Sequence, residues 1–367
     1  MQLDGSRAAG SHRAALVAAA RDTSPKATNG AIGKTAMTIR VLFIVLAGVL
    51  AGSPAVAADF KPAVVFDVGG ISDRSFNQGV FEGTERFSQE TGGGIETIQM
   101  SEDSDAIQAL TTLADEGFSP IIAVGYGQAE AMDEIAAEHP DLQFAIIDSV
   151  VDRPNVASVI FKEQEGSYVV GILAAMASET GTVGFVGGMD ISLIHRFACG
   201  FVGGVKSVDP DATILQDYVG TTSDAWRNPA RAAELAQGQI AEGADVIYHA
   251  AGGSGVGVLE AAAAAGKLGI GVDLDQNDLF PDHVLTSMLK HVDVATYDIL
   301  KASMDGGFSP GLLNLGLAED GVGWALDQYN EALITPEMKE AADASAAAIV
   351  AGELRVHDFL SDTSCPY

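Results

Sequence analysis

Cysteine is scarce in this sequence. Of its 367 residues only two are cysteines, Cys199 and Cys365, and neither lies in a CxxC motif or beside a histidine cluster. The HExxH motif is also missing, so we expect no zinc site, and we predict neither a metal nor a cofactor. In an oxidising compartment the two cysteines are free to form a disulfide, but two unpaired thiols fit the sequence equally well.

Basic residues are scarce as well. The chain has 20 Lys and Arg residues against 50 Asp and Glu residues, which gives a formal net charge of −30. A charge of this sign repels nucleic acid and anionic lipid, and it disfavours a polyphosphate ligand. We therefore expect no nucleic-acid partner.

An N-terminal apolar stretch is too short to cross a membrane. Residues 41–52 form a run of 12 residues, whereas a membrane span needs about 20. A basic segment precedes the run and a small-x-small pattern at Ala55 and Ala57 follows it, as in a secretory signal peptide. We expect cleavage before Ala58, with residues 1–57 comprising an N-terminal extension and the signal peptide. We also expect Met37 to be the true initiator, and a periplasmic protein without a lipid anchor, because no cysteine lies near the cleavage site.

From residue 61 onwards the sequence alternates between apolar strands and helical segments. Strands such as PAVVFDV, PIIAVGY and LQFAIID are apolar almost throughout, which predicts a parallel sheet covered by helices on both faces. This alternation of strands and helices runs through residues 58–162, and a second series of the same kind begins after it. We therefore predict an α/β fold with two doubly wound, Rossmann-like lobes, a hinge and an interlobe ligand cleft. Lobe 1 would comprise residues 58–162 plus about 291–320, and lobe 2 residues 163–290 plus about 321–367.

Glycines and polar residues follow the predicted strands, at the end where α/β sheets bind ligands. The first such loop, DVGGISDRSFN, lacks both phosphate-loop patterns, GxxxxGK[ST] and GxGxxG, and its aspartates would repel phosphate. The segment GGSGVG at residues 252–257 is not the GxSxG nucleophile elbow, and the calcium-binding DxDxDG spacing is missing. These exclusions leave recognition of an uncharged, hydroxyl-rich, partly aromatic ligand, with calcium at the acidic segment DLDQND, residues 273–278, as a minor alternative.

The candidate contacts are chosen for that chemistry. Carboxylates accept hydroxyl and N–H hydrogens, aromatic faces stack on flat rings, and glycines let the backbone approach closely. Asp73 and Ser75 are better explained as helix caps, and Phe76 fits a helix core as well as a ligand wall. Phe197 and Phe201, four residues apart, are typical of a core. The candidates are Asp67, Phe76, Asn77, Asp148, Trp226, Gly253, Asp273 and Lys290, with Gly70, Tyr126 and Phe201 in addition.

Seven segments resemble the basic membrane protein family of substrate-binding lipoproteins. Members of this family serve ABC importers, and several bind purine nucleosides. The resemblance covers residues 62–293, in order and at compatible spacing, and departs from the family in lacking the lipobox cysteine. The segments are FDVGGISDRSFNQGVFEG, FAIID, VGFVGGMDI, FACGFVGGVKSVDP, GADVIYHAAGGSGVGVLEAA, GVDLDQ and VLTSMLKHVD.

The resemblance implies a type I periplasmic-binding fold that closes on a nucleoside. It places ligand contacts in the opening motif at Asp67, Phe76 and Asn77. It places a carboxylate, Asp148, after the fourth strand and an indole, Trp226, where the family commonly has Phe. On the ribose side it places Gly253, Asp273 and Lys290.

We therefore expect a monomeric, non-enzymatic receptor for a purine nucleoside such as adenosine, inosine or guanosine. It would deliver this ligand to an ABC permease in the inner membrane. A sugar receptor of the same fold, an exported nucleoside hydrolase and a sensory ligand-presenting protein stay open as alternatives. The hydrolase is the weakest of these, because its clustered-aspartate motif DxDxxxDD is missing.

Overall fold

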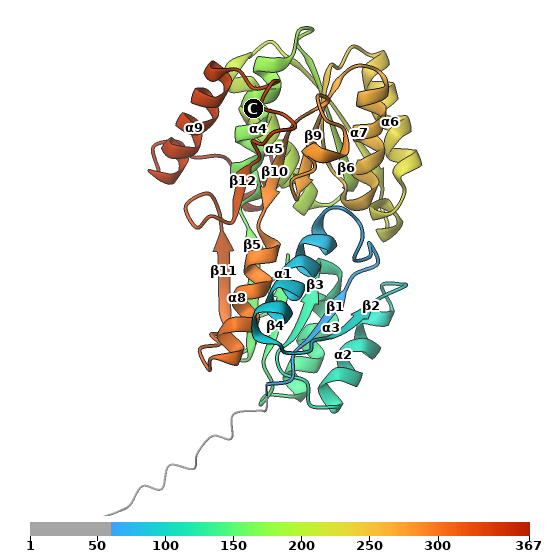
Figure 1. Ribbon diagram of the computed structural model, residues 1–367, viewed down its shortest axis with the longest axis vertical. Coiled ribbons are helices and arrows are strands. Elements are labelled where there is room, and N and C mark those ends of the chain that lie inside the picture. The colour runs from blue at the N-terminus through green and yellow to red at the C-terminus, as the bar shows by residue number, and fades with distance from the viewer. Residues whose placement is uncertain (1–59) are drawn as a thin grey trace, which may run out of the picture. The chain divides into compact units, whose positions relative to one another are not determined.

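The computed structural model describes residues 60–367. The predicted N-terminal extension and signal peptide, residues 1–57, lie outside this range. Within it the chain forms two α/β lobes, each built on one sheet (Figure 1). In these residues no helix is both long and apolar enough to cross a bilayer.

Lobe 1 contains a parallel sheet with helices packed against it. In the described residues its strands are β1 (Ala63–Phe66), β2 (Glu96–Gln99), β3 (Ile121–Val124), β4 (Phe144–Ile147), β5 (Val156–Phe161) and β11 (Gly311–Leu315). Its helices are α1 (Phe76–Thr91), α2 (Asp105–Asp115), α3 (Ala129–Glu138) and α8 (Val292–Met304), with the 3-10 turn η1 (Tyr126–Gln128). The strand order is β11-β5-β4-β3-β1-β2, and every neighbouring pair is parallel. β1, β3 and β4 are apolar and buried at every position, as strands covered on both faces must be.

Lobe 2 repeats this design with one antiparallel edge strand. In the described residues its strands are β6 (Thr182–Met189), β7 (Thr213–Gly220), β8 (Val246–Ala250), β9 (Leu268–Asp273), β10 (Val284–Lys290) and β12 (Val322–Trp324). Its helices are α4 (Glu163–Ala177), α5 (Ser192–Val208), α6 (Pro229–Ala241), α7 (Gly255–Ala264) and α9 (Pro336–Val350), with the 3-10 turns η2 (Ser223–Trp226), η3 (Gly252–Ser254), η4 (Asn277–Leu279) and η5 (Phe359–Ser361). The strand order is β12-β10-β9-β8-β6-β7, and β12 runs antiparallel to β10.

Two helices of lobe 2 show how local sequence sets the element boundaries. The side chain of Asn228 accepts a hydrogen bond from the backbone N–H of Arg231 and caps α6. The side chain of Thr335 caps α9 in the same way. A proline follows each cap, and it fits there because the first helical residue needs no N–H donor.

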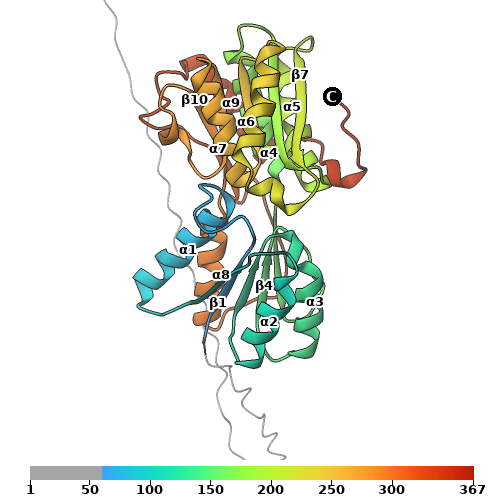
Figure 2. The ribbon, with the colours of Figure 1, turned by 90° about the vertical axis from the view of Figure 1, so that its right-hand side faces the viewer.

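The two lobes share the chain through three crossings in the described residues. The first leads from β5 to α4, the second from β10 to α8, and the third from β11 to β12. As a result α8 packs against α1, although the two helices lie far apart in the sequence (Figures 1 and 2). Lobe 1 therefore combines an N-terminal segment with a late one.

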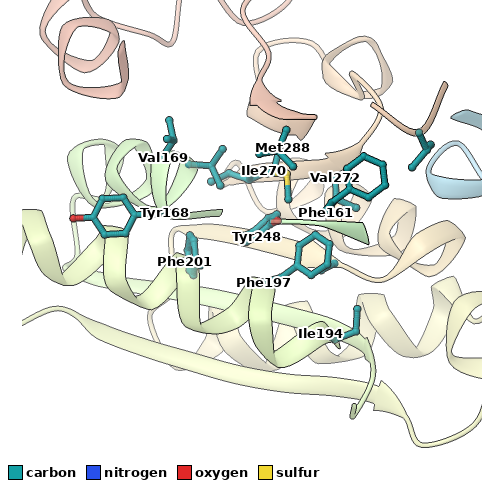
Figure 3. Close-up of a cluster of buried hydrophobic side chains, with 14 of the residues drawn as sticks. Phe161, Tyr168, Val169, Ile194, Phe197, Phe201, Tyr248, Ile270, Val272 and Met288 are labelled. Carbon is teal, nitrogen blue, oxygen red and sulfur yellow. The ribbon is translucent and has the colours of Figure 1, made fainter. Parts of the chain in front are cut away.

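A large aromatic and aliphatic cluster forms the core beneath α4 and α5 (Figure 3). Phe201 lies in this cluster with an exposed fraction of 0%, and its ring centroid is 5.2 Å from that of Tyr248 and 6.4 Å from that of Phe185. Its side chain has no surface left to offer a ligand. Phe201 is therefore a core residue, which corrects its inclusion among the candidate contacts.

Candidate functional site

A cavity lies where the carboxyl ends of strands from both lobes meet. The centre of a water molecule can reach about 60 Å³ of it. One water needs about 10–15 Å³ in this measure, so the cavity is narrow. Its lining residues are Asp67, Asp73, Phe76, Asn77, Gly125, Tyr126 and Asp148 from lobe 1, and Leu193, Ile194, Phe197, Trp226, Ala250, Gly252, Val272, Asp273 and Lys290 from lobe 2.

Two aspartates of the first loop organise the start of α1. Asp73 accepts hydrogen bonds from the backbone N–H groups of Ser75, Asn77 and Gln78 at 2.8–3.0 Å. Asp73 thus caps the helix, as the sequence predicted, and it also lines the cavity. The same prediction is wrong for the side chain of Ser75, which makes no capping hydrogen bond and is engaged with Asp273 instead. Asp67, at the end of β1, accepts a hydrogen bond from the N–H of Gly69 at 2.7 Å.

The side chain of Asn77 is held in one orientation by these aspartates. Its Nδ2 donates to Asp67 Oδ1 at 2.8 Å and to Asp73 Oδ2 at 3.0 Å. Both amide hydrogens are used in this way, so Oδ1 can only accept, and it is buried without a partner among the described residues. Burial raises the pKa of Asp67 to about 6, against the opposing hydrogen bonds from Gly69 and Asn77. The edge formed by Asp67 and Asn77 offers acceptors to a ligand.

Lys290 provides a buried ammonium at the end of β10. Its Nζ donates to Asp148 Oδ2 at 2.6 Å and lies 3.1 Å from Glu163 Oε1, while its side chain is only 2% exposed. Burial by itself would lower the pKa of Lys290, but the carboxylates of Asp148, Glu163 and Asp273 outweigh it and raise the pKa above its usual value. Lys290 is therefore a fixed positive charge in the cavity wall.

Asp148 and Asp273 occupy equivalent strand ends in the two lobes. Both have φ of +67°, a backbone conformation that is uncommon outside glycine and is often found at functional sites. The hydroxyl of Ser75 in lobe 1 donates to Asp273 in lobe 2. Burial raises the pKa of Asp273 to about 7, and the charge of Lys290 opposes this change. Asp148 Oδ1 is buried and has no partner among the described residues.

Aromatic side chains form the apolar part of the wall. Phe76, Tyr126, Phe197 and Trp226 all line the cavity, and Phe76 and Trp226 also pack against the core as partly buried side chains. The indole of Trp226 covers Gly188, where a Cβ atom would lie 2.2 Å from the ring, so glycine is needed there. The hydroxyl of Tyr126 lies 3.0 Å from the sulfur of Met189 across the lobes.

Most of the residues predicted from the sequence come together in this cavity. They are Asp67, Phe76, Asn77, Tyr126, Asp148, Trp226, Asp273 and Lys290. Gly70 and Gly253 do not line it. Gly70 adopts φ of +83° in the turn after β1, next to the side chain of Gln99, and Gly253 packs against Asp73 while its neighbour Gly252 reaches the cavity.

Two buried charges near the cavity were missed by sequence reasoning. Glu163 begins α4 and contacts Lys290, and Arg196 on α5 donates to Glu163 Oε2 at 2.9 Å. Glu163 is one of two acidic residues in the first turn of α4 and Arg196 lies in a helical segment, so neither stands out in the sequence, and only the fold brings the two together. Phe197, whose spacing from Phe201 predicts a core position, lines the cavity; helical spacing alone cannot separate it from Phe201.

The cysteine alternatives are resolved by the structure. Cys199 on α5 and Cys365 near the C-terminus form a disulfide. In residues 60–367, no group of three or more His, Cys, Asp or Glu side chains is arranged to hold a metal ion.

Two α/β lobes with three crossings and a polar, aromatic-lined cavity between them define a type I periplasmic solute-binding protein. A solved structure agrees: a solute-binding protein of an ABC transporter system from Aeropyrum pernix superposes with a TM-score of 0.75 at 26% identity, over 81% of this chain and 92% of that one. The chain belongs to the family described as ABC transporter substrate-binding protein PnrA-like (Bmp), whose sequence profile matches residues 60–354.

Two relatives carry informative names. The ABC transporter nucleoside-binding protein BmpA of Lactococcus lactis subsp. cremoris is 34% identical, over 82% of this chain and 90% of its own length. Basic membrane protein A of Borreliella afzelii is 30% identical, over 81% of this chain and 91% of its own length. The predicted resemblance to the basic membrane protein family is thereby confirmed.

Proposed function

We propose that this protein captures a purine nucleoside in the interlobe cavity and delivers it to an ABC permease in the inner membrane. The observation that carries the proposal is the set of hydrogen-bond acceptors beside aromatic faces. Asp67, the oriented Oδ1 of Asn77 and the free Oδ1 of Asp148 all accept hydrogens. A nucleoside supplies matching donors in its ribose hydroxyls and base N–H groups. The relative named as a nucleoside-binding protein supports the same ligand class.

The aromatic and the charged residues of the cavity lining suit different parts of this ligand. Phe76 would stack on one face of the base and Trp226 would form the opposite wall, since base–aromatic stacking contributes about 1–3 kcal/mol per base. Asp273 would accept the ribose hydroxyls with Lys290 close by, since both line the same cavity. Ser75, which now donates to Asp273, would share this carboxylate with the ligand or release it.

Calorimetry with matched ligands tests the proposal. Inosine, adenosine and guanosine are titrated into the purified protein, with ribose and arabinose as controls, and native mass spectrometry identifies any ligand that copurifies. We expect at least one nucleoside to bind and the pentoses to fail. Binding of a pentose without any nucleoside would support the sugar-receptor alternative and contradict our proposal.

We further propose that the ligand is returned unchanged. The cavity presents carboxylates, an amide and an ammonium, and no nucleophile paired with a histidine base is among its lining residues. Incubation with the three nucleosides should therefore release no free base and no ribose. Release above the background rate would favour the hydrolase alternative.

We propose that the mature chain starts at Ala58 and is free in the periplasm. N-terminal sequencing of the osmotic-shock fraction should find this start, and gel filtration should give a monomer. Recovery only with detergent would indicate a lipid or membrane anchor. Loss of nucleoside uptake on deletion of this protein would support a transport role, and unchanged uptake would favour a sensory role.

A further inference from the structure

We infer that the C-terminal segment, residues 355–367, positions the buried ammonium of the ligand cavity through a chain of ion pairs. This segment lies beyond the part of the chain that matches the family, residues 60–354. The chain of pairs runs from Asp358 through Arg196 and Glu163 to Lys290. The inference about ligand affinity rests on the proposed function, whereas the inference about the ion pairs does not.

The segment lies along one face of α5, and Figure 2 shows this C-terminal end of the chain beside that helix. Its contacts on α5 fall at residues 196, 199 and 203, a spacing that places side chains on one side of a helix. The ring of Tyr367 covers Gly203, where a Cβ atom would lie 2.6 Å from it. The rings of Phe359 and His195 stack with centroids 5.0 Å apart. The segment is therefore docked at several points along α5.

Arg196 joins this segment to the first crossing between the lobes. Its Nε and Nη2 donate to the two carboxylate oxygens of Asp358, both at 2.8 Å. Its Nη1 donates to the carbonyl of Phe161, the last residue of β5, at 2.6 Å and to Glu163, the first residue of α4, at 2.9 Å. Arg196 is only 3% exposed. Asp358 thus holds one side of a guanidinium whose other side holds the crossing.

Glu163 links Arg196 to the lysine in the cavity wall, because its carboxylate contacts both. Its carboxylate is fully buried and shared, with Oε2 bound to Arg196 and Oε1 lying 3.1 Å from Lys290 Nζ. Lys290 is held on its other side by Asp148 and faces the cavity. Without Asp358, two donors of a buried guanidinium lose their partner, and Glu163 becomes the nearest carboxylate that can compensate. Movement of Glu163 towards Arg196 would take one of its two carboxylate partners from Lys290 and leave the ammonium held by Asp148 alone.

The test compares two variants that each break a bidentate Arg–Asp pair. Asp358→Asn breaks the pair described here, and Asp133→Asn breaks the pair with Arg153 on lobe 1, whose bonds are 2.7 and 2.6 Å long. Mutations along a coupled network change affinity by about 2- to 30-fold. We expect a loss of inosine affinity in that range for Asp358→Asn, less than about 2-fold for Asp133→Asn, and partial rescue by Asp358→Glu. Equal effects of Asp358→Asn and Asp133→Asn would overturn the inference.

Two further measurements separate positioning from general loosening of the fold. If Asp358 acts through Glu163, the effect of Asp358→Asn on inosine affinity should vanish in a Glu163→Gln background, because the pathway is already broken there. The 15N resonance of the Lys290 ammonium, recorded without ligand, should shift in Asp358→Asn and stay in place in Asp133→Asn. A persistent effect in the Glu163→Gln background, or an unmoved resonance, refutes the inference. If the unmodified protein binds no inosine, that choice of ligand fails, and the resonance still decides whether the ion pairs are coupled.

Discussion

Replacing Lys290 with methionine removes one charge from the most deeply buried ion cluster described above. Methionine keeps much of the length and the apolar stem of lysine, so the change mainly deletes the ammonium. Asp148 and Glu163 then face each other's charge without the cation that lies 2.6 and 3.1 Å from them. Breaking a buried ion pair by removing one partner destabilises a protein by about 3–5 kcal/mol. We expect a loss of that size in the free energy of unfolding of Lys290→Met.

Urea denaturation of the ligand-free protein at pH 7 measures this loss. The raised pKa of Lys290 means that its stabilising contribution is fully present below the ordinary lysine pKa and is lost as pH rises through the raised value. The whole effect is therefore available at pH 7. At pH 5 the deficit of Lys290→Met should shrink, because burial already raises the pKa of Asp148, and without the opposing charge of Lys290 this carboxylate takes up a proton more readily.

Lys162→Met serves as the matched control. Lys162 also pairs with a carboxylate, Glu319 at 3.1 Å, but this pair is partly open to solvent. We expect it to change the free energy of unfolding by less than about 1 kcal/mol. Equal losses for the two variants, or a deficit of Lys290→Met that grows at pH 5, would refute the assignment of Lys290 as a buried, charged centre.

Three further predictions concern the cavity and the disulfide. Phe76→Ala should weaken nucleoside binding by about 5- to 150-fold in calorimetry, with little change in the melting temperature of the ligand-free protein. The control Phe81→Ala, which removes a ring whose centroid lies 6.3 Å from that of Phe66, should lower the melting temperature instead. Unfolding of Phe76→Ala would show that the ring of Phe76 belongs to the core. Because burial raises the pKa of Asp273 from 3.8 to about 7, the contribution of this carboxyl to the stability of the ligand-free protein should fall as pH rises from 4 to 7, by at most about 4 kcal/mol at about 1.4 kcal/mol per pKa unit. Denaturation curves of Asp273→Asn should lack that part of the pH dependence, and an unchanged slope would contradict the burial argument. The double variant Cys199→Ser/Cys365→Ser should unfold with a free energy lower by about 2–5 kcal/mol, because the disulfide closes a loop across 166 positions; an unchanged denaturation midpoint would argue against this estimate.

The central strands and most helices could be predicted because burial on both faces leaves an unmistakable pattern. β1, β3 and β4 are continuous apolar runs, and turn residues separate them from amphipathic helices. The edge strand β11 has no such pattern, since its first four residues are exposed and only its backbone pairs with β5. β12 has three residues and pairs on one side with β10. Both of these edge strands, GLLNL and VGW, are largely apolar but mostly exposed or half-buried, so their side chains do not reveal which strand they pair with.

The site could be predicted only as far as its residues lie in loops at strand ends. Asp67, Asp148 and Asp273 follow or end apolar strands, which marks them from sequence alone. Arg196 and Glu163 are different, because each sits in a helical segment where a charge is normally solvated, and their pairing joins residues 33 positions apart. The orientation of a helix about its axis decides which of its apolar residues reach a cavity, and spacing cannot supply that angle.

The chain returns to lobe 1 only after most of lobe 2, so the last strand and helix of lobe 1 are synthesised late. Strands β1 to β5 leave the ribosome well before β11, which pairs with β5 at residues 311–315. Until then the outer edge of β5 has no partner, and α1 lacks the helix α8 that packs against it. The first lobe therefore cannot finish folding before the second is almost complete, and pairing over such sequence separations is slow. A fragment cut at the first crossing would lack one strand and one helix, so neither lobe should be obtainable as a stable product by simple truncation.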